Sequence, residues 1–227
     1  MDHTPRVAAV HDLSGFGRCS LNIALPVLSV LGCQCCCLPT AILSAHTGFP
    51  ASPHSVFLDL TSGMEGTIAH WQELGASFDA IYSGFLGSAS QFSALHRLLS
   101  VFRKKDTLVL VDPVMGDNGA IYRTYTPALC AGMRRLADLA DVITPNVTEG
   151  AVLLGLTPTA APRTQTEAEE WVRRLSRDGR RSVILTGLAG PGDTLGALSF
   201  DRHTGEVRFF ARPRVDCPFS GTGDLFA

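Results

Sequence analysis

The sequence predicts an α/β fold in which helices cover both faces of a central, mostly parallel sheet. Short apolar runs alternate with helix-like segments along the 227 residues, and this alternation is typical of β–α–β units. The runs are short and apolar, as expected for parallel strands that are buried on both faces. Polar or Gly-rich segments follow several of them, at the strand ends where open α/β sheets bind ligands. We therefore expect a single domain over residues 1–227 with its site at the strand ends.

The first strand is expected at residues 6–10, where the apolar run RVAAV precedes a polar, Gly-rich loop. A helix is expected from about Ser20 to Leu31. The run CQCCCL at residues 33–38 predicts the second strand, and a long loop leads from it to a helix that ends near Gly75.

The middle of the chain continues the alternation. Strands are expected at residues 78–84 and 107–113, and the helix between them, at 90–104, has apolar residues at a spacing near 3.6. A helix is expected at residues 126–138, because a proline lies close to its first turn. A short strand is expected at 141–146.

The last third of the chain contains two more helices and a hairpin. Asn146 is expected to cap a helix, and Gly179 is expected to close another at residues 166–179. Residues 181–187 predict a strand. Two later runs, LGALSFD and EVRFFARP, predict a hairpin that turns near Gly205.

Composition restricts the class of partner. The chain has 18% charged residues and a formal net charge of -2, so it lacks the basic footprint of a nucleic-acid-binding protein. A small molecule is the expected partner. The motif G-x-x-x-x-G-K-[ST] is absent and no lysine lies near a Gly-rich turn, which excludes a P-loop nucleotide site. The G-x-G-x-x-G spacing is also absent after the first strand, which argues against a nicotinamide cofactor.

No charged residue occurs between Cys19 and Leu58, which raises the possibility of a membrane span. Pro26 and Gly32 interrupt the stretch before about 20 apolar residues accumulate. A buried helix followed by a buried strand is therefore favoured, and no membrane partner is expected. The apolar run after the N-terminal residues is also too short for a signal peptide.

Four cysteines cluster in the second expected strand: Cys33, Cys35, Cys36 and Cys37. Adjacent residues on a strand point to opposite faces, and no second Cys/His pair at zinc spacing follows. We therefore favour small hydrophobic side chains in a reducing cytosol over a structural metal site.

The first two expected strands are followed by polar side chains that suit a small ligand. Asp12 and Ser14 lie in the first loop, where they can hydrogen-bond a ligand. Ser44, His46 and Thr47 follow the second strand, although a capped turn is an equally good interpretation of that segment.

Carboxylates follow two later strands. Asp112 and Asp117 lie five residues apart across a Pro–Gly turn, and such a pair suits Mg²⁺, which prefers few carboxylates, several waters and substrate phosphates. Asn146 and Glu149 lie at the start of the next helix, where they can cap it or orient water around the same ion. For Asp117, a solvated turn is the alternative.

The segment GTGD lies three residues from the end of the chain. Gly221 and Gly223 allow the backbone to approach an anion closely, and a helix is expected to begin near Thr222. Its free N–H groups can hold developing phosphate charge. Asp224 is placed to take a proton from a substrate hydroxyl. A glycine turn that closes a loop is the alternative.

Taken in order, the segments HDLSGFGRCS, LSAHTG, YSGFLGS, DPVMGDNG, ITPNVTE, ILTG and GTGD resemble the pyridoxal kinases of the ribokinase-like superfamily. The resemblance covers essentially the whole chain. It implies a three-layer α/β/α fold and transfer of a phosphoryl group from MgATP to the 5′-hydroxymethyl group of pyridoxal, pyridoxine or pyridoxamine. It also implies a cytoplasmic homodimer, and a family pattern that continues past GTGD into C-terminal helices that are missing here.

The resemblance also implies a role for individual residues. Asp224 would be the catalytic base, with Gly221, Thr222 and Gly223 as the anion hole. Asp112 and Glu149 would be the metal residues, with Asn146 and Glu149 holding Mg²⁺ largely through water. Asp112 and Asp117 would manage metal and phosphate charge. The nucleotide would lie near Asp112, Asp117, Asn146, Glu149 and Thr186. The vitamer would lie near Asp12, Ser14, His46, Thr47, Phe85 and Tyr122.

The first loop departs from the family pattern. Many pyridoxal kinases have a QSHV run there, and Asp12 stands where its serine would be. The loop is also similar to the TDPSGG segment of hydroxymethylpyrimidine kinases. Two alternatives therefore stay open: a hydroxymethylpyrimidine kinase, and an inactive, truncated remnant that binds the vitamer.

Overall fold

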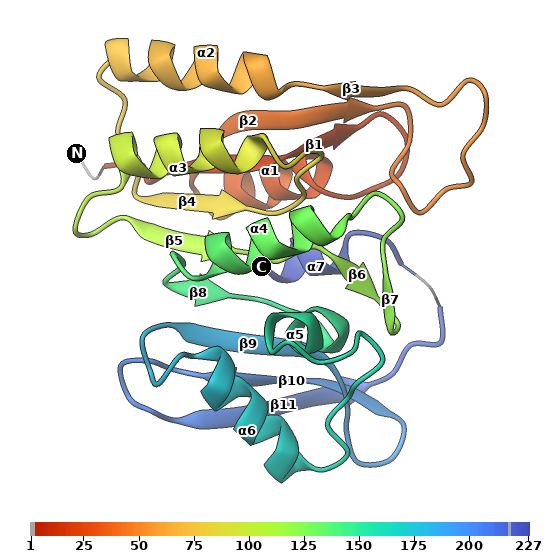
Figure 1. The fold of residues 1–227 in the computed structure, drawn as a ribbon. Helices are drawn as coiled ribbons and strands as arrows, with labels where there is room; N and C mark the ends of the chain where they lie inside the picture. The colour runs from red at the N-terminus through yellow and green to blue at the C-terminus, as the bar shows by residue number, and fades with distance from the viewer. Residues whose placement is uncertain (1–2, 218) are drawn as a thin grey trace. The chain divides into compact units, whose positions relative to one another are not determined.

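The computed structural model describes residues 3–217 and 219–227 (Figure 1). The chain divides into two compact units. The first consists of Met1–Asp112 and Phe219–Ala227, and the second is Pro113–Pro218.

The sheet of the first unit has the strand order β5-β4-β1-β2-β3. Its strands are β1 (Arg6–Ser14), β2 (Gln34–Leu43), β3 (Phe57–Asp59), β4 (Ala80–Ser83) and β5 (Leu108–Val111). All neighbours are parallel except β2 and β3. The carboxyl ends of the four parallel strands consequently lie along the same edge of this sheet.

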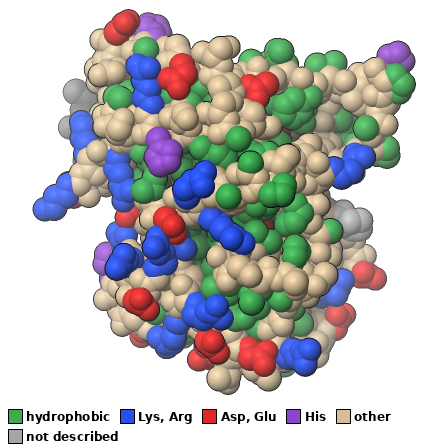
Figure 2. All heavy atoms as spheres, viewed as in Figure 1, with side chains coloured by type: hydrophobic (Ala, Val, Ile, Leu, Met, Phe, Trp, Pro, Cys, Tyr) green, Lys and Arg blue, Asp and Glu red, His purple; other side chains and the backbone are tan. Residues whose placement is uncertain are grey.

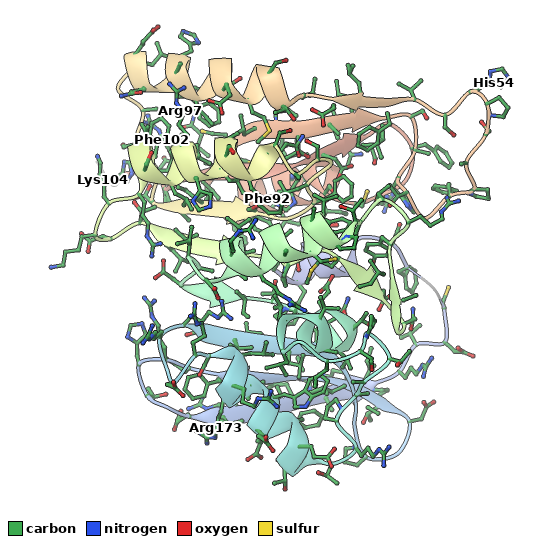
Figure 3. The ribbon with its side chains drawn as sticks, viewed as in Figure 1. His54, Phe92, Arg97, Phe102, Lys104 and Arg173 are labelled. Carbon is green, nitrogen blue, oxygen red and sulfur yellow. The ribbon has the colours of Figure 1, made fainter. Side chains whose placement is uncertain are left out.

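Helices cover both faces of this sheet (Figure 1). They are α1 (Leu21–Val30), α2 (Thr61–Glu73), α3 (Gln91–Phe102) and α7 (Thr222–Phe226), with α2 and α3 on one face and α1 on the other. Arg97 of α3 reaches Glu65 of α2 at 3.2 Å, on the solvent side of the pair (Figure 3). Beneath them, the ring of Phe78 packs against Trp71 and Phe102.

The sheet of the second unit has the strand order β11-β10-β9-β8. Its strands are β8 (Val142–Ile143), β9 (Ser182–Ala189), β10 (Thr194–Phe200) and β11 (Val207–Pro213). The pair β8–β9 is parallel, and the two later pairs are antiparallel. A separate hairpin is formed by β6 (Gly116–Asp117) and β7 (Ala120–Ile121).

Three helices belong to the second unit: α4 (Pro127–Ala137), α5 (Val147–Leu153) and α6 (Gln165–Leu175). Thr126 caps α4 by accepting the Leu129 N–H, and proline occupies the first turn as predicted. The buried side of α6 packs on β9 and β10. There the guanidinium of Arg173 lies 5.8 Å from the ring centroid of Phe200 (Figure 3).

The predicted α/β class is confirmed, and every predicted helix and strand is present, but several boundaries were wrong. The first strand extends to Ser14 instead of ending at Val10, because Leu13 and Ser14 pair with Ile42 and Leu43 of β2. The short strand β3 and the β6–β7 hairpin were missed, since runs of two or three residues carry too little periodicity to detect.

The prediction that the first helix is buried was also wrong. Of the side chains of α1, only Leu21 and Ala24 are buried, whereas Leu25 is 45% exposed and Val30 88% exposed. The outer side of α1 has no cover from the residues that the structure describes. No described helix is long and apolar enough to cross a membrane.

Residues 34–38 of the cysteine-rich run begin β2, as predicted, whereas Cys33 precedes the strand. Cys35 and Cys37 lie on the same face, with their sulfur atoms 3.9 Å apart.

Acidic and basic side chains are interspersed over the face of the molecule in Figure 2, which agrees with the small net charge.

Candidate active site

The GTGD segment begins α7, as the sequence predicts. Gly221 is the N-cap residue with a left-handed φ of 75°, a conformation that glycine adopts without strain. A Cβ atom at this position would lie 2.3 Å from the carbonyl oxygen of Arg18. At the other end of α7, Ala227 packs against Val7 and Tyr82. The helix is therefore fixed between the first loop and the sheet of the first unit.

Asp224 lies in the first turn of α7, and its carboxylate lies next to residues of β1 and of the loop after it. The backbone N–H of Ser20 donates to its Oδ2 at 2.8 Å, and its Oδ1 lies 3.8 Å from Nδ1 of His11. Burial raises the pKa of Asp224 to about 6, and the charge of Asp12 adds to the rise, against the opposing hydrogen bond from Ser20. Such a carboxylate is ionised at neutral pH and basic enough to accept a proton.

Asp112 directly follows the parallel strand β5 and is 6% exposed. Its backbone N–H donates to the carbonyl of Ser83 at 2.8 Å. Its Oδ2 lies 3.7 Å from the position that a Cβ atom would take on Gly223, so this carboxylate borders the first turn of α7. Asp112 and Asp224 thus bring two acidic side chains to the same helix terminus.

Asp12 and Ser14 are buried at the end of β1. The hydroxyl of Ser14 donates to Oδ2 of Asp12 at 2.9 Å, and the charge of Asp12 helps to raise the pKa of Asp224. These side chains lie in the strand itself and not in the predicted loop, which gives them a fixed orientation.

Three rings form an aromatic cluster between the first loop and the loop after β2: Phe16, His46 and Phe49. The centroid of Phe49 lies 4.5 Å from that of His46 and 5.3 Å from that of Phe16. The backbone N–H of His46 donates to the backbone carbonyl of Phe16 at 3.2 Å. Gly17 has no room for a side chain, because a Cβ atom there would meet the His46 ring. Phe16 is 66% exposed, and no local pattern in the sequence distinguishes it as a site residue.

The remaining residues of the first unit occupy different environments. Thr47 is half-buried beside His46. Phe85 is 6% exposed, and its carbonyl accepts the hydroxyl of Thr40 at 3.0 Å. Ser44 is exposed, and its hydroxyl accepts the Val56 N–H, so it serves the turn that the sequence allowed as the alternative.

In the second unit, Asn146 and Glu149 form a capping box at the start of α5. Asn146 Oδ1 accepts the Glu149 N–H at 3.0 Å, and Glu149 Oε2 accepts the Asn146 N–H at 2.9 Å. The other oxygen of Glu149 accepts the N–H of Met115 at 3.0 Å. Thr186 pairs with Asn146 in a parallel bridge beyond β8, so the structure brings these predicted residues together.

A pocket of about 150 Å³ opens beside this capping box. It is lined by Asp117, Asn118, Gly119, Asn146, Val147, Thr148, Pro158, Thr159, Ala160, Ala161 and Gly187. Asp117 is exposed, and its carboxylate accepts hydrogen bonds from the backbone and side chain of Asn118. Tyr122 follows β7, and its N–H donates to the Met115 carbonyl; it is not among the residues that line the pocket.

Replacing Glu149 by Ala is expected to lower the free energy of unfolding by about 2–4 kcal/mol, because two backbone N–H groups lose their acceptor in a buried position. Glu167 is a matched control, since it occupies the same position of α6 and accepts the Arg163 N–H while exposed. Glu167→Ala should cost less than about 1 kcal/mol. Urea unfolding measures both values, and equal losses would contradict the importance of burial.

Asp224 should make stability depend on pH in a defined direction. Its folded-state pKa of about 6 exceeds the ordinary value of 3.8, so the folded protein binds this proton more tightly than the unfolded chain does. The resulting stabilisation is present below about pH 4 and is lost as the pH rises through 6. Relative to Asp224→Asn, the wild type should lose about 2–3 kcal/mol between pH 4 and 7. Urea unfolding at matched pH measures this difference, and a constant difference would argue against the raised pKa.

Comparison with known proteins identifies the family. The family model described as phosphomethylpyrimidine kinase matches residues 27–227. The chain is 33% identical to the pyridoxine/pyridoxal/pyridoxamine kinase of Bordetella avium, over 97% of this chain and 74% of that relative.

Solved structures agree with this assignment. A proposed phosphomethylpyrimidine kinase from Bacteroides thetaiotaomicron, crystallised with pyridoxal, has 41% identity and a TM-score of 0.92 over 99% of this chain and 78% of that chain. The pyridoxal kinase of Lactobacillus plantarum has 29% identity and a TM-score of 0.85 over 98% and 77%. The chain thus spans about three quarters of the length of these relatives. It belongs to the pyridoxal kinases of the ribokinase-like superfamily, within the phosphomethylpyrimidine kinase family.

Proposed function

We propose that this protein transfers the γ-phosphoryl group of ATP to the 5′-hydroxymethyl group of pyridoxal, pyridoxine or pyridoxamine. The observation that carries the proposal is the position of Asp224. It combines a raised pKa, a fixed hydrogen bond from Ser20 and a place in the first turn of α7. A general base beside a glycine-rich helix start suits proton removal from a hydroxyl that attacks a phosphoryl group.

In the proposed mechanism, Asp224 accepts the proton of the vitamer hydroxyl as that oxygen bonds to the γ-phosphorus of ATP. The bond from this phosphorus to the bridging oxygen breaks at the same time, and ADP leaves. The backbone N–H groups of Gly221, Thr222 and Gly223 face the transferring phosphoryl group and stabilise its negative charge. No side chain crowds Gly223, where a Cβ atom would make only an ordinary contact. Catalysis is then mostly positioning and electrostatic stabilisation, as is usual for phosphoryl transfer.

The vitamer ring is proposed to bind at the aromatic cluster. The exposed surface of Phe16 and the half-buried His46 offer stacking partners for a planar pyridine ring. Asp12, Ser14 and Thr47 provide polar groups for its substituents. Phe85 is proposed to support the wall of this site.

The nucleotide is proposed to bind in the second unit, along the pocket beside Asn146 and Asp117, with Thr186 near the phosphates. Mg²⁺ is proposed as the accompanying ion. The buried carboxylate of Asp112 lies at the helix start where phosphate is proposed to bind. A cation there would offset the repulsion between this carboxylate and the phosphate. Among the described residues, no three His, Cys, Asp or Glu side chains form a metal cage, which suits an ion that keeps water and phosphate ligands.

Asp112 would contact this ion most directly. In the second unit, both carboxylate oxygens of Glu149 already accept backbone N–H groups, so Glu149 would meet a cation only through water. When bound, Mg²⁺ neutralises phosphate charge and orients the γ-phosphoryl group.

The purified chain should convert pyridoxal to pyridoxal 5′-phosphate with ATP and Mg²⁺, and EDTA should abolish the reaction. The alternative substrate is hydroxymethylpyrimidine, favoured by the matching family model and by Asp12 in the first loop. We expect kcat/KM for pyridoxal to exceed that for the pyrimidine by about tenfold or more. Competition at equal concentrations measures the ratio. A pyrimidine preference would assign the second function, and pyridoxal binding without turnover would indicate an inactive remnant.

We further propose a cytoplasmic homodimer. The described cysteines are all free thiols, as expected in a reducing compartment. The exposed apolar side chains of α1, Leu25 and Val30, favour burial against a second copy. Light scattering on the purified chain tests the oligomeric state.

A further inference from the structure

His11 is a buried titratable residue that the proposed mechanism does not use. Its side chain, on β1, has no solvent exposure. The ring meets that of Tyr82 edge-on, with centroids 4.2 Å apart and an interplanar angle of 69°. Gly84 provides the space, because a Cβ atom there would lie 2.4 Å from the imidazole. The site is therefore shaped around the histidine ring.

The polar atoms of this ring lack hydrogen bonds. Among the residues that the structure describes, neither ring nitrogen of His11 has a hydrogen-bond partner, and the hydroxyl of Tyr82 has none either. Buried polar side chains in proteins are nearly always hydrogen-bonded, so an exception needs an explanation. Nδ1 of His11 faces a carboxylate oxygen, Oδ1 of Asp224, at 3.8 Å.

The two oxygens of Asp224 face different partners. Oδ2 is fixed by the Ser20 N–H at 2.8 Å, whereas Oδ1 lies on the side of His11 at a distance too long for a hydrogen bond. Catalytic hydrogen bonds are often long in the absence of substrates and tighten when the substrates bind. Burial lowers the pKa of His11 to about 3, so the neutral ring can donate from Nδ1 without bringing a positive charge to the base.

We propose that His11 is a positioning residue for the catalytic base, whose Nδ1–H closes on Oδ1 of Asp224 when the substrates bind. The carboxylate is then held between His11 and Ser20, and its remaining lone pairs point toward the substrate hydroxyl. Tyr82 packs against the imidazole and fixes its plane. The inference rests on the proposed kinase function.

Three substitutions of His11 test it in the wild-type background. The amide nitrogen of His11→Asn takes approximately the place of Nδ1, that of His11→Gln takes the place of Nε2, and His11→Leu provides neither. We expect Asn to keep kcat within about threefold, and Gln and Leu to lower it about tenfold or more, with both KM values little changed. His96→Asn, on the exposed side of α3, is the matched control and should leave kcat unchanged.

The same substitutions in the Asp224→Asn background separate positioning from a general effect on folding. If His11 acts through Asp224, His11→Leu should cause no further loss of the residual kcat there. Equal losses in both backgrounds, or wild-type kcat in the folded His11→Leu variant, would overturn the inference. If Leu fails to fold by circular dichroism, the comparison of Asn with Gln decides, and equal kcat for those two would also overturn it. A wild-type chain without kinase activity would instead refute the proposed function.

Discussion

Asp224→Asn is expected to lower kcat for pyridoxal phosphorylation by about 10²–10⁴-fold, the usual contribution of a general base. The amide keeps the size of the side chain, and its oxygen can still accept the N–H of Ser20. The variant therefore loses the basic group and little else. Because the N-terminal turn of α7 remains, KM for ATP should change much less than kcat. Steady-state kinetics with pyridoxal and ATP measure both parameters.

Asp106→Asn is the control for this substitution. Asp106 lies in an exposed turn between α3 and β5, in the same unit as Asp224, and its replacement should leave kcat within about twofold of the wild type. If Asp224→Asn retained more than about a tenth of wild-type kcat, another group would have to accept the proton. The raised pKa of Asp224 would then be a consequence of burial alone.

The fold was predictable because strands and helices of ordinary length carry their own signals. The apolar runs at β1, β4 and β9, and the capped start of α5 at Asn146, are local features of the sequence. The elements that were missed have two or three residues each, and pairing with a neighbour defines them. The exposed side of α1 could not be inferred either, since an apolar helix indicates burial only if other elements cover it.

The residues of the candidate site were predicted by type but not by contact. Asp112, Asp224 and Glu149 are acidic residues at strand or helix ends, a position that sequence can reveal. The groups that contact Asp224 could not be identified from the sequence. The N–H of Ser20 is a backbone group, and His11 directly follows the apolar run at residues 6–10, at the start of the predicted loop. Only the tertiary structure brings both groups to the carboxylate.

Gly221→Ala is expected to lower the free energy of unfolding by about 2–4 kcal/mol and kcat by about 10²-fold. The alanine would adopt a left-handed φ of 75°, and its Cβ would lie 2.3 Å from the Arg18 carbonyl oxygen, so the start of α7 or the first loop must shift. That loop also provides the Ser20 N–H to Asp224. A displacement of about 1 Å at a catalytic group is enough for such a loss of rate, and the strain accounts for the loss of stability.

Gly205→Ala separates the two causes. Gly205 has a similar φ of 72° in the β10–β11 turn, but a Cβ atom there would meet nothing within 4 Å. This control should cost only about 1 kcal/mol from backbone strain and leave kcat unchanged. Urea unfolding and steady-state kinetics on both variants give the comparison. If the two alanines were equally destabilising, the clash with Arg18 would not contribute, because both positions share the same backbone strain. If Gly221→Ala lost stability but kept its kcat, α7 would retain its catalytic geometry without the close contact to the first loop.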